Sequence, residues 1–316
     1  MYSYRHGFHA GNHADVLKHL CLIGTARHLM RKSTPLLMVD THAGAGVYRL
    51  DGDYARTSGE AQEGVLRLVA EGFKPNPAQA ADKSAQAAIN SEASLLDDYL
   101  QLVASFNPQA GDWRMYPGSP FILQRLMDEP TRAAVHDRLK LFEMHPTDVQ
   151  TLLDHVTQLD VGRRVSVAPE DGFASLRALI PPPATAGGSR RALVLIDPSY
   201  EIKTDYAQVA DSIQDALKRF ATGVYLVWYP IIPRPEAHGL PRRLKTLAQQ
   251  AGRSWLHATL NIGAAPDGSG GLSASGMFIV NPPHPLKGQL DATLPTVLDA
   301  LSRGRGAAWS VEAGQA

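Results

Sequence analysis

The sequence predicts a doubly wound α/β fold, in which helices cover both faces of a mostly parallel sheet. Two observations lead to this prediction. Short apolar runs typical of buried strands recur through the second half of the chain, and helical patterns separate most of them. An earlier apolar run, Leu36 to Asp40, ends in an acid and precedes the small-residue turn THAGAG, as expected of a strand that leads into a ligand-binding loop. With 316 residues, the chain can form one large domain with a smaller one inserted in it.

A helix is expected before this first strand. Residues from Asn12 to about Met30 have helical periodicity, and either Asn12 or Asp15 could cap the helix. The apolar side chains expected on or near its buried face are Val16, Leu20, Ile23 and Leu29.

Residues 53–112 differ from the rest of the chain. Helical patterns cover Gly59 to Ala70 and Ser94 to Phe106, and the stretch from Lys74 to Ala93 is rich in alanine and poor in β-branched residues. Because no strand pattern is present, we expect a small helical subdomain at 53–112, inserted in an α/β domain made of residues 1–52 and 113–302.

The remaining strands and helices are expected at regular spacing. The last two strands are separated only by a loop and are predicted to form an antiparallel hairpin at the sheet edge, and residues 303–316 are predicted to be a flexible tail. With the first strand, the sheet would have seven strands. The later strands are predicted at 139–143, 163–168, 192–197, 223–229, 254–262 and 275–281, and the helices at 147–159, 171–180, 205–220 and 241–251.

The composition excludes several classes of protein. The 31 basic and 31 acidic residues balance, so a uniformly basic nucleic-acid-binding surface is excluded, although a local basic patch is not. The single cysteine, Cys21, excludes disulfides, cysteine-based zinc sites and iron–sulfur clusters within one chain. No apolar run reaches the roughly 18 residues of a membrane span, and the polar N-terminus does not resemble a signal peptide. We expect a cytoplasmic monomer.

The N-terminal segment is locally basic and rich in histidine. Five Lys or Arg and one acid precede residue 33, and six of the twelve histidines lie at or before His42. The spacing of these histidines matches no standard zinc pattern, so no metal site is predicted. Residues 1–20 could instead fold over a bound ligand as a lid.

The turn after the first strand is the first candidate ligand site. Gly44 and Gly46 in DTHAGAG would allow a tight turn and a close approach of the backbone to a ligand. Arg49 occupies the position of the third glycine in the dinucleotide-binding fingerprint, and no Walker motif is present, which favours a ligand without a pyrophosphate. A purely structural turn is the alternative.

Two acids follow the next strands. Glu143 could accept hydrogen bonds from both hydroxyls of a ribose, as acidic residues do in nucleotide-binding α/β folds, or it could be an ordinary exposed glutamate. Asp171 could accept a hydrogen bond from an adenine amine, or it could cap the next helix with Gly172 in the turn.

The most specific motif is DPSY, which begins at Asp197. The carboxylate of Asp197 and the carbonyl of Pro198 could both accept hydrogen bonds from one NH2 group, while Tyr200 could stack on the base that carries it. Such a set would recognise an exocyclic amine. The alternative is a proline turn with a core tyrosine. A similar motif at Asn281 to His284 lacks the aromatic residue.

Several of these motifs, taken in order, resemble one known family. They are YRHGFHAGNHADVLKH, DTHAGAG, YPGSP, EMHP, EDGF and DPSYE, and the resemblance runs from Tyr4 to about Pro283. The chain resembles the bacterial large-subunit ribosomal RNA methyltransferase J family. The resemblance implies a Rossmann-like class I methyltransferase fold with a helical subdomain inserted after the first strand. It also implies transfer of a methyl group from S-adenosyl-L-methionine to N6 of one adenine in 23S ribosomal RNA.

The resemblance also assigns roles to individual residues. Asp197 would be the catalytic residue that holds the target amine, and Tyr4 would meet the RNA. The pattern of the family is Asp-Pro-Pro-Tyr, so Ser199 is a departure that affects the stiffness of the turn. The residues that would contact the cofactor are His19, His42, Ser119, Glu143, Asp171 and Gly172, with Lys18 as a further candidate beside His19.

Other functions share parts of this pattern. A DNA adenine-N6 methyltransferase would use the same amine-reading motif, but the balanced charge and the lack of a recognisable DNA-reading module disfavour it. A non-catalytic RNA-binding or nucleotide-binding module is a second alternative, supported by the Ser199 departure. A nicotinamide-dependent dehydrogenase is disfavoured by the missing third glycine.

Overall fold

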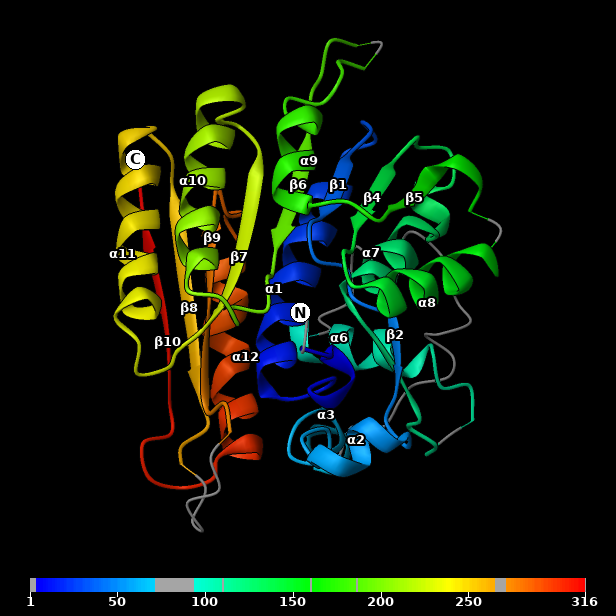
Figure 1. The fold of residues 1–316 in the computed structure, drawn as a ribbon, viewed down its shortest axis with the longest axis vertical. Coiled ribbons are helices and arrows are strands. Elements are labelled where there is room, and N and C mark those ends of the chain that lie inside the picture. The colour runs from blue at the N-terminus through cyan, green and yellow to red at the C-terminus, as the bar shows by residue number, and fades with distance from the viewer. Residues whose placement is uncertain are drawn as a thin grey trace.

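The computed structural model describes residues 4–71, 94–109, 111–159, 161–185, 187–264 and 271–315. These residues form an α/β fold around an eight-stranded sheet with the order β10-β8-β9-β7-β6-β1-β4-β5 (Figure 1). The strands are β1 (Leu37–Asp40), β4 (Arg138–Phe142), β5 (Val165–Ala168), β6 (Ala192–Ile196), β7 (Val224–Pro230), β8 (Trp255–Asn261), β9 (Ala274–Val280) and β10 (Ala308–Gly314).

The sheet is mixed, with a parallel half and an antiparallel half. Strands β7, β6, β1, β4 and β5 pair in parallel, whereas β9, β8 and β10 continue the sheet by antiparallel pairing. All seven predicted strands are present and β10 is an eighth. The predicted hairpin of β8 and β9 forms, but it is not at the edge, because β9 pairs with β7 and β10 covers β8.

The expectation of a flexible tail at 303–316 is wrong. Residues Ala308 to Gly314 pair with β8 along its whole length, from Asn261 back to Trp255. Trp309 and Val311 also pack against the hydrophobic core. Strand β10 forms hydrogen bonds with backbone groups of β8 that would otherwise face water. The sequence of residues 303–316 has no clear apolar period, so this pairing could not be predicted from it.

Two layers of helices cover the sheet, as predicted. One core cluster joins α1, α7 and α12 to side chains such as Leu193 and Leu195, and a second joins α9, α10 and α11 to Val194 and Ile196. All five residues of β6 are buried, as is typical of a central parallel strand. Helices α7 and α12 are not among the predicted ones. The helices are α1 (His13–Met30), α7 (Ser119–Met127), α8 (Pro146–Thr157), α9 (Gly172–Leu179), α10 (Thr204–Arg219), α11 (Pro235–Gln250) and α12 (Leu286–Leu301).

A helical segment is inserted between two short antiparallel strands, β2 (Val47–Arg49) and β3 (Met115–Pro117). It contains α2 (Asp53–Ser58), α3 (Val65–Ala70) and α6 (Leu95–Ala104), and it packs against α1 and α12. Three 3-10 turns complete the described elements: η1 (His6–Phe8), η2 (Pro130–Arg132) and η3 (Gly162–Arg164). Most of the alanine-rich stretch lies outside the described residues.

Helix α1 is buried on all sides rather than on one face. The Asn12 side chain caps it by accepting hydrogen bonds from the backbone N–H groups of Ala14 and Asp15, and every residue from His13 to Ala26 is buried. The polar side chains of this helix are therefore inside the protein, where each needs a partner. None of the helices in the described residues combines the length and apolar character that a membrane crossing requires.

Candidate active site

A cavity of about 800 Å³ opens at the carboxyl ends of the parallel strands. Loops that follow β1, β4, β5 and β6 contribute to its walls, together with the N-terminal segment. This is the switch point of the sheet, where ligands bind in open α/β folds, and the volume is in the range of small-molecule sites. The predicted site residues that line the cavity are Tyr4, Lys18, His42, Gly44, Ser119, Glu143, Asp171, Gly172, Asp197 and Pro198.

A buried group of charges surrounds Lys18. Its Nζ lies 2.7 Å from Oδ1 of Asp15 and 2.7 Å from Oδ2 of Asp197. Burial alone would lower the pKa of Lys18, but the two carboxylates hold that pKa well above its ordinary value, so the ammonium stays charged. Lys18 thus fixes one carboxylate oxygen of Asp197 and leaves the other available to a ligand.

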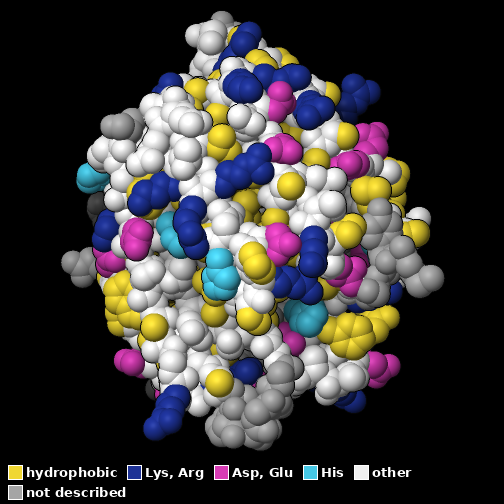
Figure 2. Space-filling view, turned by 60° about the vertical axis from the view of Figure 1, so that its left-hand side comes forward, with side chains coloured by type: hydrophobic (Ala, Val, Ile, Leu, Met, Phe, Trp, Pro, Cys, Tyr) yellow, Lys and Arg dark blue, Asp and Glu magenta, His cyan; other side chains and the backbone are white. Residues whose placement is uncertain are grey.

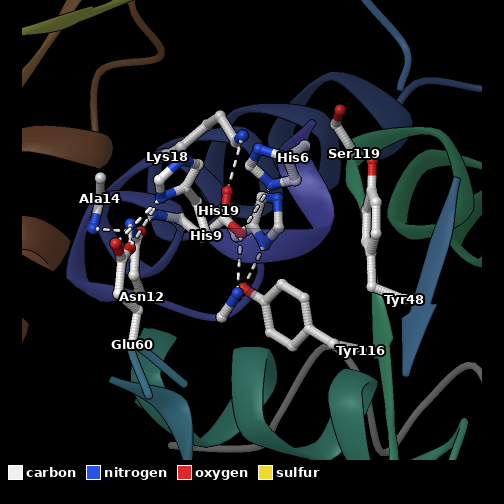
Figure 3. A network of polar contacts seen from close by, with 12 residues as sticks. His6, His9, Asn12, Ala14, Lys18, His19, Tyr48, Glu60, Tyr116 and Ser119 are labelled. Atoms are coloured by element: carbon white, nitrogen blue, oxygen red, sulfur yellow. Dashed lines mark hydrogen bonds and ion pairs between the residues drawn. The ribbon is translucent and has the colours of Figure 1, made fainter. Parts of the chain in front are cut away.

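The same group extends into the N-terminal segment. Oδ2 of Asp15 lies 2.9 Å from Nε2 of His6, and Nδ1 of His6 lies 2.9 Å from the hydroxyl of Tyr4. Burial would raise the pKa of Asp15, but His6 and Lys18 hold it well below its ordinary value. Figure 3 shows His6 and Lys18 within one polar network. Asp15 and His6 are not among the predicted site residues, although the spacing of Asp15 and Lys18 along α1 is the signal that could have indicated the pair.

His19 does not line the cavity. Its side chain is fully buried, and its Nδ1 shares a hydrogen bond of 2.8 Å with the hydroxyl of Tyr116, which lies 3.1 Å from that of Tyr99. Burial lowers the pKa of His19 to about 3, so the ring is neutral. Its Nε2 has no hydrogen-bond partner among the described residues. The predicted cofactor contact of His19 is thus not part of the cavity wall in this structure.

The loop after β1 and the end of β4 are joined by Glu143. Oε2 of Glu143 accepts a hydrogen bond from the backbone N–H of Gly44 at 2.8 Å, and Oε1 accepts one from His145 at 2.7 Å. Gly44 has a φ of +60°, and a Cβ there would lie 2.2 Å from the hydroxyl of Tyr48. The backbone thus orients both carboxylate oxygens, and each retains a lone pair for a ligand.

A second acid lies beneath the cavity wall. Oδ2 of Asp40 accepts a hydrogen bond of 2.6 Å from the Ser119 hydroxyl, and burial raises the pKa of Asp40 to about 6. His42 lies nearby, with its Nδ1 2.8 Å from Oγ1 of Thr41, and burial lowers the pKa of His42 to about 4. The sequence places Asp40 at the end of a strand and at the start of the DTHAGAG motif without singling it out as a site residue, although its position directly before the ligand loop is the signal for one.

Asp171 caps α9 and also lines the cavity. Its Oδ1 accepts hydrogen bonds from the backbone N–H groups of Phe173 and Ala174, so the capping interpretation is confirmed. A Cβ on Gly172 would lie 2.1 Å from the carbonyl oxygen of Thr41. Only glycine therefore allows the first turn of α9 to approach the loop after β1 this closely.

The structure contradicts the expected position of Tyr200. Pro198 and Ser199 line the cavity, but the Tyr200 side chain is 3% exposed and is not part of the cavity wall. Its hydroxyl donates a 2.6 Å hydrogen bond to the carbonyl of Trp228, and its ring centroid is 4.5 Å from that of Tyr206. With a φ of +55°, the backbone turns the ring into the core, so it is not placed to stack on a base.

The cavity wall is acidic. Six carboxylates line it against one lysine, Lys18. Two of the carboxylates are paired, Asp148 with Arg5 and Asp197 with Lys18, and the remaining excess of negative charge favours a cationic ligand. The acidic residues are Glu143, Asp148, Asp171, Asp197, Glu201 and Asp205.

Neither a metal nor a reactive cysteine is indicated at this site. Within the described part of the chain, no group of three or more His, Cys, Asp or Glu residues could hold a metal ion. Cys21 is fully buried in α1, as predicted, and burial raises the pKa of its thiol. The polar groups that line the cavity are carboxylates, hydroxyls, backbone amides, imidazoles and the ammonium of Lys18.

Comparisons with known proteins agree with this geometry. A family model described as "Ribosomal RNA large subunit methyltransferase D, RlmJ" matches residues 33–312. The protein named ribosomal RNA large subunit methyltransferase J in Escherichia coli K12 is 40% identical over 296 residues, which cover 93% of this chain and 92% of that protein. The protein of the same name in Haemophilus influenzae is 34% identical over 312 residues, with 99% and 98% of the two chains covered.

A solved structure shows that the similarity includes the inserted segment. The crystal structure of a Legionella pneumophila protein has a TM-score of 0.74 and 28% sequence identity, and the match covers 97% of this chain and 98% of that one. The chain therefore belongs to the ribosomal RNA large subunit methyltransferase J family and is a methyltransferase of the class I α/β fold.

Proposed function

We propose that this protein transfers the methyl group of S-adenosyl-L-methionine to N6 of one adenine in 23S ribosomal RNA. The observation that carries the proposal is the place of Asp197 and Pro198 in the wall of an acidic cavity, with Lys18 holding one oxygen of that carboxylate. Membership in the methyltransferase J family supports RNA as the substrate class.

The acidic wall and the volume of the cavity support the proposed cofactor. S-adenosyl-L-methionine supplies an activated methyl group on a sulfonium centre, and six carboxylates in the cavity wall would balance its positive charge. Glu143 would bind the ribose hydroxyls through the lone pairs that remain on its two oxygens. The other residues that would hold the cofactor are His42, Gly44, Ser119, Asp171 and Gly172. His19 is fully buried behind the wall and would not contact the cofactor directly.

Asp197 would orient the target amine. Its free oxygen and the Pro198 carbonyl would accept the two N6–H groups of the adenine, which directs the nitrogen lone pair toward the methyl group. Such orientation can lower a barrier by as much as roughly 7–11 kcal/mol. The methylated amine is acidic and loses its proton, for which Asp197 is the adjacent acceptor. The adenine must leave its stack, which costs a few kcal/mol and less in loosened RNA.

The N-terminal segment would close over both ligands. Tyr4 and His6 line the cavity, and burial together with the charge of Asp197 raises the pKa of Tyr4 well above its ordinary value, so its hydroxyl stays protonated. We infer that Tyr4 meets the RNA substrate. Tyr200 would act indirectly, since its bond to Trp228 holds the turn that carries Asp197 and Pro198.

A methyl-transfer assay tests this proposal. Purified protein, cofactor with a labelled methyl group and unmodified 23S ribosomal RNA should give labelled RNA, and mapping should find N6-methyladenine at one position. Duplex DNA should remain unlabelled. Labelling of DNA but not RNA would favour the DNA methyltransferase alternative, and failure of the wild-type protein to label either would support a non-catalytic binding module.

A further inference from the structure

The acidic cavity cannot hold the RNA backbone. Phosphates along RNA are negatively charged, and non-specific affinity for nucleic acid comes mostly from Lys and Arg that neutralise them. Glu201 and Asp205 belong to the loop and helix start that follow the DPSY motif, and both contribute negative charge to the cavity wall. A protein with zero net charge must therefore bind the flanking RNA through a local basic surface outside the cavity.

Helix α11 carries such a surface. His238, Arg242 and Lys245 fall within an arc of about 60° on the helix at about 100° per residue, and Arg234, the extended N-cap residue, precedes them. The buried positions, such as Leu240 and Leu244, lie on a different face of the helix. We call the four residues the α11 basic stripe.

Charge is strongly biased in this part of the chain. Residues 234–253 contain five Lys or Arg and one acid, Glu236, whereas the whole chain is balanced. Figure 2 shows the side of the molecule that carries α11. Lys and Arg side chains, in dark blue, are more numerous in the upper half of this view than in the lower half. Arg243, on the α10 side of the helix, is paired with Asp211 and is not part of the stripe.

The stripe is available to a partner. His238, Arg242 and Lys245 are exposed, and none of them forms an ion pair with a residue that the structure describes. Lys245 lies over the Trp255 ring, with Nζ 4.4 Å from its centroid, which holds the stem of the side chain against the protein. An exposed row of unpaired basic side chains is suited to phosphates rather than to an apolar partner.

The stripe begins beside the amine-binding turn. Arg234 precedes α11, and its Nη1 lies 3.5 Å from the carbonyl oxygen of Tyr200, the last residue of the DPSY motif. From Arg234 to Lys245 the helix rises about 16 Å, which is several times the rise of roughly 3.4 Å per nucleotide of a strand. An RNA strand that leaves the cavity at this turn could therefore continue along the stripe.

We propose that the α11 basic stripe binds the phosphate backbone of the ribosomal RNA that flanks the target adenine. This inference rests on the proposed function, because it takes RNA as the substrate. The stripe contributes affinity and orientation rather than chemistry, and it makes binding salt-dependent.

Charge reversal tests the stripe. The variant Arg242→Glu/Lys245→Glu changes two exposed side chains. The control Arg138→Glu/Arg163→Glu makes the same change in charge beside β4 and β5, which lie at the other end of the strand order from β8. KM and kcat are measured with a 23S ribosomal RNA transcript and with a short oligonucleotide centred on the mapped adenine, at several salt concentrations. Circular dichroism verifies that both variants are folded.

The stripe variant should raise KM for the transcript by roughly tenfold, leave kcat and the KM for the oligonucleotide unchanged, and reduce the slope of log affinity against log salt by about 1–2. An unchanged KM, or an equal loss in the control, would overturn the inference. If the wild-type protein labels no RNA, the proposed function itself fails, and the stripe inference falls with it.

Discussion

The cavity wall and the antiparallel extension of the sheet are built on different principles. In and behind the cavity wall, the buried polar side chains of α1 and β1 include Asp15, Lys18, His19 and Asp40, of which only Lys18 lines the cavity itself. In the antiparallel extension, which we define as β8, β9, β10 and α12, the buried polar side chains among the described residues are Ser275 and Thr293. The rest of that core is apolar.

The difference in buried polar side chains indicates which region keeps destabilising buried charges for the sake of function. A buried charge destabilises a fold unless it is paired, and replacing a buried ion pair with apolar residues often costs nothing. The antiparallel extension contains no such groups among its described residues and would supply stability. The charges around Lys18 instead hold Asp197 in place. The predictions below test this division, from the largest expected effect to the smallest.

Removal of the Asp197 carboxylate should affect activity most. We expect Asp197→Ala to reduce kcat by on the order of 10³-fold, because the amine loses its acceptor in a water-poor site. Labelled methyl transfer measures the loss, and the melting temperature controls for folding. Near wild-type activity in a folded Asp197→Ala protein would contradict the proposed mechanism.

Truncation of an apolar side chain in the antiparallel extension should lower stability and leave activity unchanged. Leu260 in β8 is fully buried, so Leu260→Ala should lower the free energy of unfolding by about 3 kcal/mol. Urea denaturation measures the change. Because Leu260 does not line the cavity, kcat of the folded variant should stay within twofold of the wild type. A tenfold loss would contradict the assignment of stability to one region and function to the other.

Asp15 should act as a positioning residue through Lys18. Asp15→Asn keeps the side-chain shape but removes one of the two charges that raise the pKa of Lys18, so that pKa should fall. We expect kcat to drop roughly 10- to 100-fold with little change in KM. The alkaline limb of the pH–rate profile should also move to lower pH. A profile identical to the wild type would show that Asp15 is merely structural.

His19 should make the fold sensitive to mild acid. Its folded-state pKa, about 3, is below the ordinary value of 6.5, so the unfolded chain binds the proton first and stability is lost as the pH falls below 6.5. From pH 7.5 to 5.5 this amounts to about 1.4 kcal/mol.

The variant His19→Asn should remove this part of the pH dependence, as measured by urea denaturation at the two pH values. The exposed His136→Asn serves as the control and should leave it in place. An unchanged pH dependence in His19→Asn would indicate that the ring is not buried in a neutral form.

Local sequence patterns were sufficient for most of the fold. Alternating apolar runs and helical periods locate the seven strands and most helices, and of the two cap candidates, Asn12 and Asp15, the structure selects Asn12. The motifs at the strand ends were also readable, because the carboxyl edge of a parallel sheet collects the loops that follow its strands. For that reason the sequence predicts Glu143, Asp171 and Asp197 as ligand-binding residues, and all three line one cavity.

Tertiary structure alone decided the contacts between distant segments. Lys18 meets Asp197 across 179 residues of chain, Tyr200 turns inward to bond Trp228, and β10 finds the edge of β8. Local periodicity reports which face of an element is apolar, but not which remote backbone edge or charge that face will meet. Those choices depend on how the whole core packs, which is why the sequence determined the elements and motifs while the three-dimensional fold determined their partners.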